Sequence, residues 1–148
     1  MERIKNIREE KDLKQKDVAN IIGIKRSTYA SYETCRDTIP LKHLNTLCNY
    51  FNISLDYALG LTDVKRYDNE LDEINIEIAG ERLKNLRKEN NLTQMEISKI
   101  LNTSRSAWTG YECKKFLIST LLIYEVAKKY NYSIDYILGK TDYPIKLK

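Results

Sequence analysis

Two arginines in this chain are each followed by a serine. Arg26 is followed by Ser27, and Arg105, seventy-nine positions later, is followed by Ser106. A guanidinium group can bind the O6 and N7 atoms of guanine through two parallel hydrogen bonds, a contact that discriminates between bases by about 1–3 kcal/mol. The alternative use of an exposed arginine is contact with phosphate alone. Both uses are recognition chemistry, in which no covalent bond is made or broken.

The two arginines belong to a long internal repeat. Residues 3–63 recur as residues 82–142 without insertion or deletion, and polar positions match more often than apolar ones. The identical pairs include Arg3/Arg82, Asn6/Asn85, Arg8/Arg87, Gln15/Gln94, Tyr32/Tyr111, Glu33/Glu112, Asp56/Asp135 and Gly60/Gly139. A shared core would preserve only the apolar spacing, so the retained polar residues indicate that both copies serve a similar task.

Charge is distributed unevenly along the 148 residues. Residues 1–66 carry twelve basic and nine acidic side chains (net +3), residues 67–78 carry none and five (net −5), and residues 79–148 carry thirteen and seven (net +6). We therefore predict basic domains at 1–66 and 78–148, joined by an acidic linker at 67–77. Basic domains attract polyanions over about 8 Å at physiological salt, although an ordinary solvated surface explains the charge equally well. Fully extended at roughly 3.3 Å per residue, residues 64–78 would reach about 50 Å.

Several function classes lack their sequence signatures. The chain has no phosphate-binding glycine loop, HExxH motif or nucleophile elbow, and it contains one histidine, so we predict no enzymatic activity, no cofactor and no small-molecule ligand. Its three cysteines lack the spacing of a zinc site or a disulfide framework. No apolar run is long enough to span a bilayer and the first residues are charged, which predicts a cytoplasmic protein without a membrane partner.

Apolar residues follow helical spacing in both copies. Ile4 and Ile7, for example, are followed by Val18, Ile21 and Ile22, and no run alternates with the period of a strand. This pattern predicts an all-α chain with about five short helices per copy. The last helix of each copy is expected to start at a serine N-cap and to end at a glycine suited to the left-handed conformation. These residues are Ser54 and Gly60 in the first copy and Ser133 and Gly139 in the second.

Little chain separates the second and third predicted helices. Only Gly23-Ile24-Lys25 or Asn102-Thr103-Ser104 lies between them, and Gly and Asn both tolerate positive φ. Two short helices joined by so tight a turn form a helix-turn-helix, whose second helix can enter the major groove of DNA. The spacing therefore indicates a DNA-binding geometry.

Two segments carry a family resemblance. QKDVANIIGIKRSTYASYE (15–33) and QMEISKILNTSRSAWTGYE (94–112) resemble the helix-turn-helix of lambda-repressor and Cro-like transcription regulators. The trailing SLDYALGLTD and SIDYILGKTD resemble the segment that closes this domain in phage-type repressors. The resemblance implies two tandem five-helix lambda-repressor-like domains and a sequence-specific regulator that binds double-stranded DNA, a repressor of phage or mobile-element type. A protein-interaction module of antitoxin or anti-repressor type, with one copy bound to a protein, is the alternative.

The resemblance also implies where DNA would be contacted. Recognition helices would start at Lys25 and Ser104, with Arg26 and Arg105 as base readers. The expected DNA-binding residues of the first copy are Gln15, Lys25, Arg26, Ser27, Thr28, Ser31, Thr34 and Arg36. Those of the second copy are Gln94, Ser104, Arg105, Ser106, Ala107, Thr109, Gly110, Lys114 and Lys115. The two glutamines are expected to contact phosphate and to support the recognition helix, and the residues after each recognition helix are expected at phosphates. Because the two sets differ, we predict an operator that is an imperfect repeat.

In this family an arginine and a glutamate tie the first helix to the third. Arg8 and Glu33, and likewise Arg87 and Glu112, hold these positions. Such pairs are architectural, since removing one partner leaves the other charge buried. The family usually has glycine two residues after that glutamate, where this chain has Cys35 and Lys114, so the geometry of the following turn is left open.

The second copy differs from the first in its apolar residues and its caps. Phe116, Leu117, Leu121 and Leu122 stand where the first copy has Asp37, Thr38, Lys42 and His43. We expect these four apolar residues to face outward and to pack against the other domain, the linker or a second chain in a homodimer; altered core packing is the alternative. Thr93 and Glu96 form a capping-box motif, whereas Lys14 and Lys25 are poor caps that we hypothesise are retained for phosphate.

Overall fold

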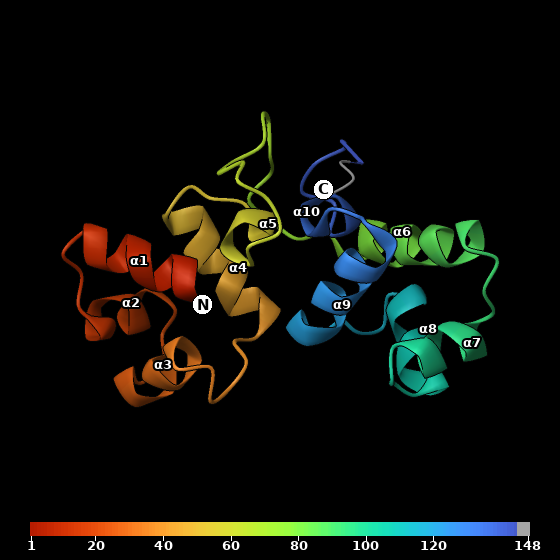
Figure 1. The fold of residues 1–148 in the computed structure, drawn as a ribbon, viewed down its shortest axis with the longest axis horizontal. Coiled ribbons are helices and arrows are strands. Elements are labelled where there is room, and N and C mark those ends of the chain that lie inside the picture. The colour runs from red at the N-terminus through yellow and green to blue at the C-terminus, as the bar shows by residue number, and fades with distance from the viewer. Residues whose placement is uncertain (145–148) are drawn as a thin grey trace. The chain divides into compact units, whose positions relative to one another are not determined.

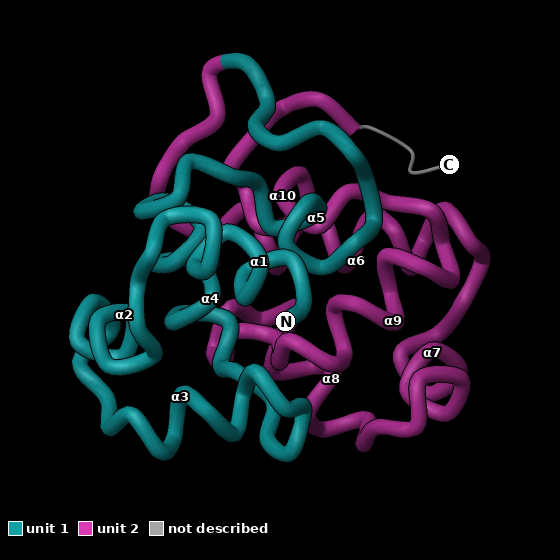
Figure 2. The backbone as a smooth tube through the Cα atoms, turned by 60° about the vertical axis from the view of Figure 1, so that its left-hand side comes forward, with its two compact units in different colours: residues 1–68 teal, residues 69–148 magenta. Residues whose placement is uncertain are grey.

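All the regular secondary structure in the part of the chain that the structure describes is helical. A computed structural model describes residues 1–144, and all its regular elements are helices (Figure 1). Two compact units divide the chain, residues 1–68 and 69–148 (Figure 2). The predicted second domain ends at residue 148, and its residues 145–148 lie outside the described residues. The prediction of an all-α chain with five helices in each repeat is confirmed.

Each unit contains five helices in the same order. Those of unit 1 are α1 (Glu2–Glu10), α2 (Gln15–Ile21), α3 (Arg26–Glu33), α4 (Leu41–Tyr50) and α5 (Leu55–Ala58). Those of unit 2 are α6 (Ile76–Glu89), α7 (Gln94–Ile100), α8 (Arg105–Glu112), α9 (Thr120–Tyr130) and α10 (Ile134–Ile137). Within residues 1–144 no helix combines the length and the apolar composition needed to cross a membrane.

Helix α6 is longer than its counterpart α1. It has 14 residues against 9, and the extra turn lies at its N-terminus, where the side chain of Asn75 accepts a hydrogen bond from the N–H of Ile78 at 3.1 Å. Gly80 lies in the next turn, and a Cβ there would stand 2.9 Å from the carbonyl oxygen of Glu112. The glycine therefore lets α6 approach the end of α8 closely.

The last helix of each unit begins and ends as the sequence predicts. The hydroxyl of Ser54 accepts a hydrogen bond from the N–H of Tyr57 at 3.0 Å, and that of Ser133 accepts one from Tyr136 at 3.1 Å. Gly60 and Gly139 both have φ of +76°. A serine satisfies one of the N–H groups that a helix start leaves open, and a left-handed glycine turns the chain away at its end.

The core of each unit centres on a large aromatic residue of the third helix. Tyr29 in α3 and Trp108 in α8 are fully buried, together with apolar residues of the neighbouring helices. Leu44 and Leu47 of α4, like Ile123 and Val126 of α9, are also fully buried. Burying one such side chain is worth about 1.5–3 kcal/mol, so these contacts hold the third helix of each unit in place.

The acidic connector makes polar contacts with each unit. In unit 1 the hydroxyl of Tyr67 donates to the buried Asp56 carboxylate at 2.7 Å. In unit 2 the N–H of Leu71 donates to the carbonyl of Lys140 at 2.8 Å, and the Lys140 ammonium lies 3.6 Å from the Glu70 carboxylate. Polar groups of each unit therefore hold the part of the connector that lies beside them. Only residues 68 and 69 separate Tyr67 from Glu70.

A candidate nucleic-acid interface

The turn between the second and third helix has the same backbone in both units. Gly23 has φ of +69° and Asn102 has φ of +54°. In unit 1 the N–H of Ile24 donates to the carbonyl of Ala19 at 3.0 Å, and in unit 2 Thr103 donates to Ser98 at 2.9 Å. The tight turn expected from the sequence is confirmed, and it sets α3 against α2 and α8 against α7.

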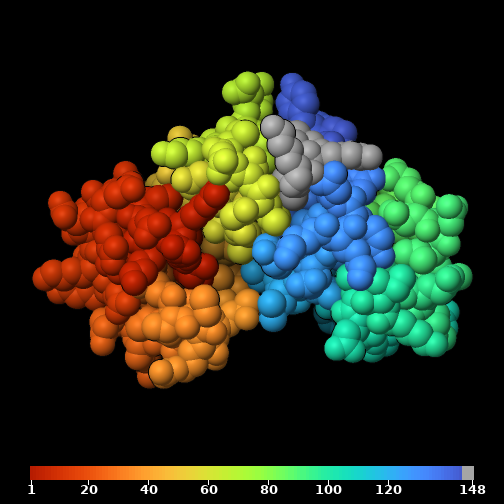
Figure 3. All heavy atoms as spheres, viewed as in Figure 1, coloured from red at the N-terminus to blue at the C-terminus, as the bar shows by residue number. Residues whose placement is uncertain are grey.

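The outer face of each third helix is open to solvent. Lys25, Arg26 and Ser27 are exposed at the start of α3, as are Ser104, Arg105 and Ser106 at the start of α8. Both helices lie at the surface of their own unit, α3 in orange and α8 in turquoise (Figure 3). Thr28, Ser31 and Thr109 are half-buried, and Thr34, Arg36 and Lys115 are exposed. The structure therefore gathers most of the expected DNA-binding residues on one helix and its following loop in each unit.

The arginine and glutamate of each repeat form a bidentate ion pair. Arg8 Nε lies 2.6 Å from Glu33 Oε1 and its Nη2 lies 3.2 Å from Oε2. Arg87 Nε lies 2.7 Å from Glu112 Oε2 and its Nη2 lies 3.0 Å from Oε1. The glutamate side chains are only 2% and 3% exposed, so each carboxylate is removed from water. The pair thus joins the first helix to the third in both units.

The same arginines also hold the chain where the first helix ends. The third guanidinium nitrogen of Arg8 donates to the carbonyl of Leu13 at 2.8 Å, and that of Arg87 donates to Leu92 at 2.9 Å. Each guanidinium is therefore satisfied on three nitrogens, and it fixes the start of the helix-turn-helix relative to the first helix.

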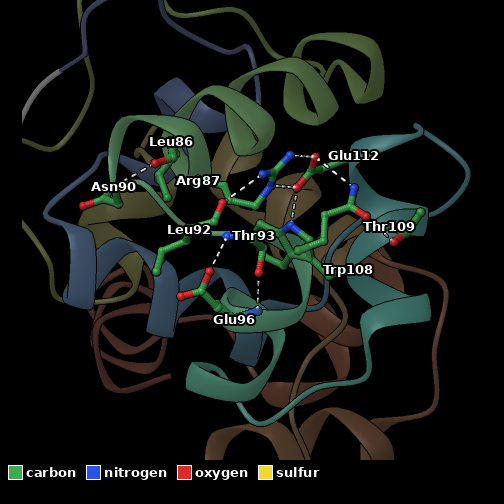
Figure 4. Close-up of polar contacts among 10 residues, drawn as sticks. Leu86, Arg87, Asn90, Leu92, Thr93, Glu96, Trp108, Thr109 and Glu112 are labelled. Carbon is green, nitrogen blue, oxygen red and sulfur yellow. Dashed lines mark hydrogen bonds and ion pairs between the residues drawn. The ribbon is translucent and has the colours of Figure 1, made fainter.

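Hydrogen bonds determine the charge state of the two glutamates. Burial acts to raise the pKa of Glu33, but hydrogen bonds from Arg8 and Gln15 hold it below its ordinary value. For Glu112, burial is likewise outweighed by Arg87, then by the indole N–H of Trp108 and by Gln94, so its pKa is lowered. Figure 4 shows the Arg87 guanidinium and the Trp108 indole both directed at the Glu112 carboxylate. Both carboxylates are ionised at neutral pH.

The indole hydrogen bond was not foreseen from the sequence. Trp108 is fully buried in the core of unit 2, and its indole N–H also donates to the Glu112 carboxylate. The residue at this position in unit 1 is Tyr29, and burial, followed by the neighbouring Glu33 carboxylate, raises the pKa of its hydroxyl. The four-residue separation of Trp108 and Glu112 could have indicated this contact, because residues four apart lie on the same face of a helix.

The two glutamines connect the buried ion pair to the exposed helix face. Gln15 Nε2 donates to Glu33 at 2.8 Å, while its oxygen accepts from Arg26 Nη1 at 2.8 Å. Gln94 Nε2 donates to Glu112 at 3.3 Å, while its oxygen accepts from the Thr109 hydroxyl at 3.0 Å. The glutamines therefore connect to side chains of the recognition helix, as suits residues that support it, and their phosphate contact stays a prediction.

Residues 35 and 114 take the conformation that the family's glycine would take. Cys35 has φ of +58° and Lys114 has φ of +64°. The geometry that the sequence left open is thus a left-handed turn in both units, which for a residue with a side chain costs about 1–2 kcal/mol.

Lys114 is held by its own unit. Its ammonium lies 3.2 Å from a carboxylate oxygen of Glu77 and 3.4 Å from one of Glu81, both on α6, and the hydrogen bond that it donates to Glu77 contributes most to raising its pKa. The expected phosphate contact would have to replace these two ion pairs. Cys35, its counterpart in unit 1, has no comparable charge.

Gly110 lies differently from the expectation, and of the four apolar residues of unit 2 two are exposed and two are half-buried. Gly110, expected to face the groove, is buried because the Phe116 ring covers it. Phe116 and Leu121 are 52% and 60% exposed, and Leu117 and Leu122 are half-buried. Phe116 lines a hollow of about 500 Å³ beside Arg105 and Thr109, whereas Leu121 and Leu122 line another of about 490 Å³ beside Ile100 and Tyr111. Phe116 and the pair Leu121 and Leu122 therefore line two different hollows.

Both halves of the chain match the same protein-family model. A family model described as a helix-turn-helix domain matches residues 1–64 and again residues 80–142. The chain is 37% identical over 62 residues to an uncharacterized HTH-type transcriptional regulator, YobD, of Bacillus subtilis, a match that covers 42% of this chain and 55% of that protein. It is 36% identical over 78 residues to the antitoxin PezA of Streptococcus pneumoniae, covering 48% and 49%.

The matched regions are partial. The chain spans about half the length of these two relatives. No solved structure matches the chain significantly.

Proposed function

We propose that this chain, which belongs to the helix-turn-helix domain family through both of its units, is a sequence-specific regulator of transcription that binds double-stranded DNA. One observation carries the proposal: each unit exposes Arg and Ser at the start of a third helix that a buried ion pair holds in place. Such a helix has the dimensions to enter the major groove, where an arginine distinguishes guanine from other bases. The regulator named among the relatives supports the same function.

In unit 1 the base reader would be Arg26. The hydrogen bond from Arg26 Nη1 to Gln15 occupies one of its donors, which leaves the remaining nitrogens for a base edge. In unit 2 it would be the exposed Arg105. Lys25, Arg36 and Lys115 are exposed beside these helices and would contact phosphates, which position the protein without specifying sequence.

A tandem of two readers would favour a repressor. Once one unit is bound, the second is present at an effective concentration of about millimolar for a short tether. Occupying a promoter in this way is sufficient to block transcription, so we propose a repressor of the kind found on phages and mobile elements. The operator would be an imperfect repeat, since α3 and α8 share Arg and Ser but differ elsewhere.

The decisive experiment is selection of bound duplexes from a random pool. The intact chain should select two related half-sites. Arg26→Ala and Arg105→Ala should each relax the preference at one half-site, weakening binding to the selected duplex by about 5- to 150-fold, the equivalent of about 1–3 kcal/mol. Lys5→Ala and Lys84→Ala, which remove exposed charges from α1 and α6, serve as matched controls. Binding that depends on salt but not on sequence would overturn the proposal.

A second candidate function is that unit 2 binds a protein. Two observations favour it: Leu121 is 60% exposed beside a hollow of about 490 Å³, and one relative is named an antitoxin. A second chain of the same protein is the partner that can be tested directly. Sedimentation of the intact chain and of Leu121→Lys would show a change in oligomeric state if this surface is an interface. The Arg105→Ala selection separates the functions, because an unaffected motif would assign unit 2 to a protein.

A further inference from the structure

The aromatic ring of Phe116 stands over the exposed face of α8. A Cβ at Gly110 would lie 2.6 Å from Phe116 Cδ2 and 3.0 Å from Cε2, so the ring occupies the space that a side chain at position 110 would take. Glycine inside a helix destabilises it by about 1 kcal/mol relative to alanine. The glycine is explained by the ring: a residue with a side chain would displace Phe116.

The ring nevertheless remains half open to solvent. Phe116 is 52% exposed and forms one wall of the hollow of about 500 Å³. The other walls include Arg105, Ser106 and Thr109, which are the residues that α8 would present to a base, and Lys115, whose ammonium lies 5.5 Å from the ring centroid. An apolar wall thus lies among hydrogen-bonding and cationic groups on the same face.

This combination matches one particular base edge. In the major groove, thymine presents the O4 acceptor and, next to it, the hydrophobic C5 methyl group, whereas guanine and cytosine present no methyl group. The hydroxyl and cationic groups of the hollow can donate hydrogen bonds to base acceptors and phosphates, and the Phe116 ring can make an apolar contact with the methyl group. Unit 1 has Asp37 and Ser31 at the positions of Phe116 and Gly110, so it lacks this wall.

We propose that Phe116 is a specificity-determining residue of unit 2 that contacts the C5 methyl group of a thymine in its half-site. The proposal rests on the DNA-binding function proposed above and adds the base that unit 2 prefers. An apolar segment of a protein partner is the competing occupant of the same hollow.

The test removes only the methyl group. In the duplex selected by the intact chain, the half-site of unit 2 is the one whose preference is lost in Arg105→Ala. Each thymine of that half-site is replaced in turn by deoxyuridine, which lacks the C5 methyl group, and affinity is measured for the intact chain and for Phe116→Ala. We expect one replacement to weaken binding of the intact chain about fourfold, the worth of one buried methyl-sized group. Phe116→Ala should bind both duplexes equally.

Matched variants separate the ring from other effects. Leu121→Ala removes another exposed apolar side chain of unit 2 and should retain the fourfold discrimination. Asp37→Ala alters the equivalent position of unit 1 and should also retain it. The fluorescence of the buried Trp108 shows whether Phe116→Ala keeps unit 2 folded, and Phe116→Leu, which preserves an apolar contact, should retain part of the discrimination.

The outcomes distinguish this inference from the function on which it rests. If the intact chain selects no sequence, the proposed function fails and the inference fails with it. A second outcome is that the chain selects a sequence and yet binds the thymine and deoxyuridine duplexes equally, and a third is that it selects a unit 2 half-site that contains no thymine. Either of these outcomes overturns only the inference. Tighter DNA binding by Phe116→Ala would also overturn it, because the ring would then obstruct α8 and the hollow would suit a protein.

Discussion

In unit 1 the hydrogen-bonded series that starts at Arg8 passes through Glu33 and Gln15 and ends at Arg26, whereas in unit 2 the series from Arg87 ends at Thr109. The buried part is the same, but the exposed end differs. Arg26 is therefore oriented by its own unit before any ligand binds, and Arg105 has a neighbouring aromatic wall instead. The repeat therefore preserves the buried ion pair and glutamine that position α3 and α8, while the surface residues diverge.

Removing the arginine of the ion pair should have the largest effect. We expect Arg87→Ala to lower the free energy of unfolding of unit 2 by about 3–5 kcal/mol, because the Glu112 charge would stay buried without its partner. Trp108 is the single tryptophan, so its fluorescence during urea unfolding follows unit 2. Arg8→Ala is the matched change in unit 1 and should leave the Trp108 transition in place. If Arg8→Ala destabilised unit 2 as much as Arg87→Ala does, each ion pair would not be stabilising only its own unit.

Acid should lower the stability that the Arg87–Glu112 ion pair gives to unit 2. The pKa of Glu112 is lowered in the folded state, so the unfolded chain binds more protons as the solution becomes acidic. The stability contributed by this carboxylate is fully present above pH 4.5, its ordinary pKa, and is lost as the pH falls through the lower folded-state pKa. Urea unfolding followed by Trp108 fluorescence from pH 6 to pH 3 should show this decline. Glu112→Gln, less stable at neutral pH, should show a flatter profile; an unchanged slope would contradict the assignment.

The helix caps provide a smaller test of the difference between units. Ser104 accepts a hydrogen bond from the N–H of Ala107 at 3.0 Å, whereas Lys25 makes no such bond to α3. Lys25→Ser should stabilise unit 1 by about 1 kcal/mol and reduce the salt dependence of DNA binding by about one phosphate contact. Thermal unfolding and a salt titration measure the two effects. Unchanged affinity with higher stability would show that Lys25 does not meet phosphate.

The smallest expected effect concerns the left-handed residues. Cys35→Gly should stabilise unit 1 by about 0.5–1 kcal/mol, since the relief of left-handed strain exceeds the added freedom of glycine in the unfolded chain. Lys114→Gly should stabilise unit 2 less, because it also removes the ion pairs to Glu77 and Glu81. Comparison of both variants by urea unfolding tests this difference. A larger gain at residue 114 would mean that these exposed ion pairs contribute nothing.

Local features of the sequence predicted much of the fold. Gly23 and Asn102 identified the turn, and Ser54 and Ser133 identified helix starts, because backbone conformation and capping depend on a few neighbouring residues. The positions of the two ion pairs followed from the family resemblance. The side-chain partners of Gln15 and Gln94 did not follow from the sequence, since an amide can bind a phosphate, a carboxylate or a hydroxyl group, and spacing alone does not distinguish these groups.

Taken alone, the sequence determined that the chain is a repeated all-α domain with a tight turn before each exposed Arg-Ser pair, because helical periodicity, caps and turns are short-range properties. Tertiary structure alone decided which surfaces these residues form. Phe116 covers Gly110, Lys114 reaches Glu77 on α6, and Tyr67 binds Asp56. Each of these contacts joins residues that their positions in the chain do not pair, and packing and desolvation select one partner among many with suitable chemistry.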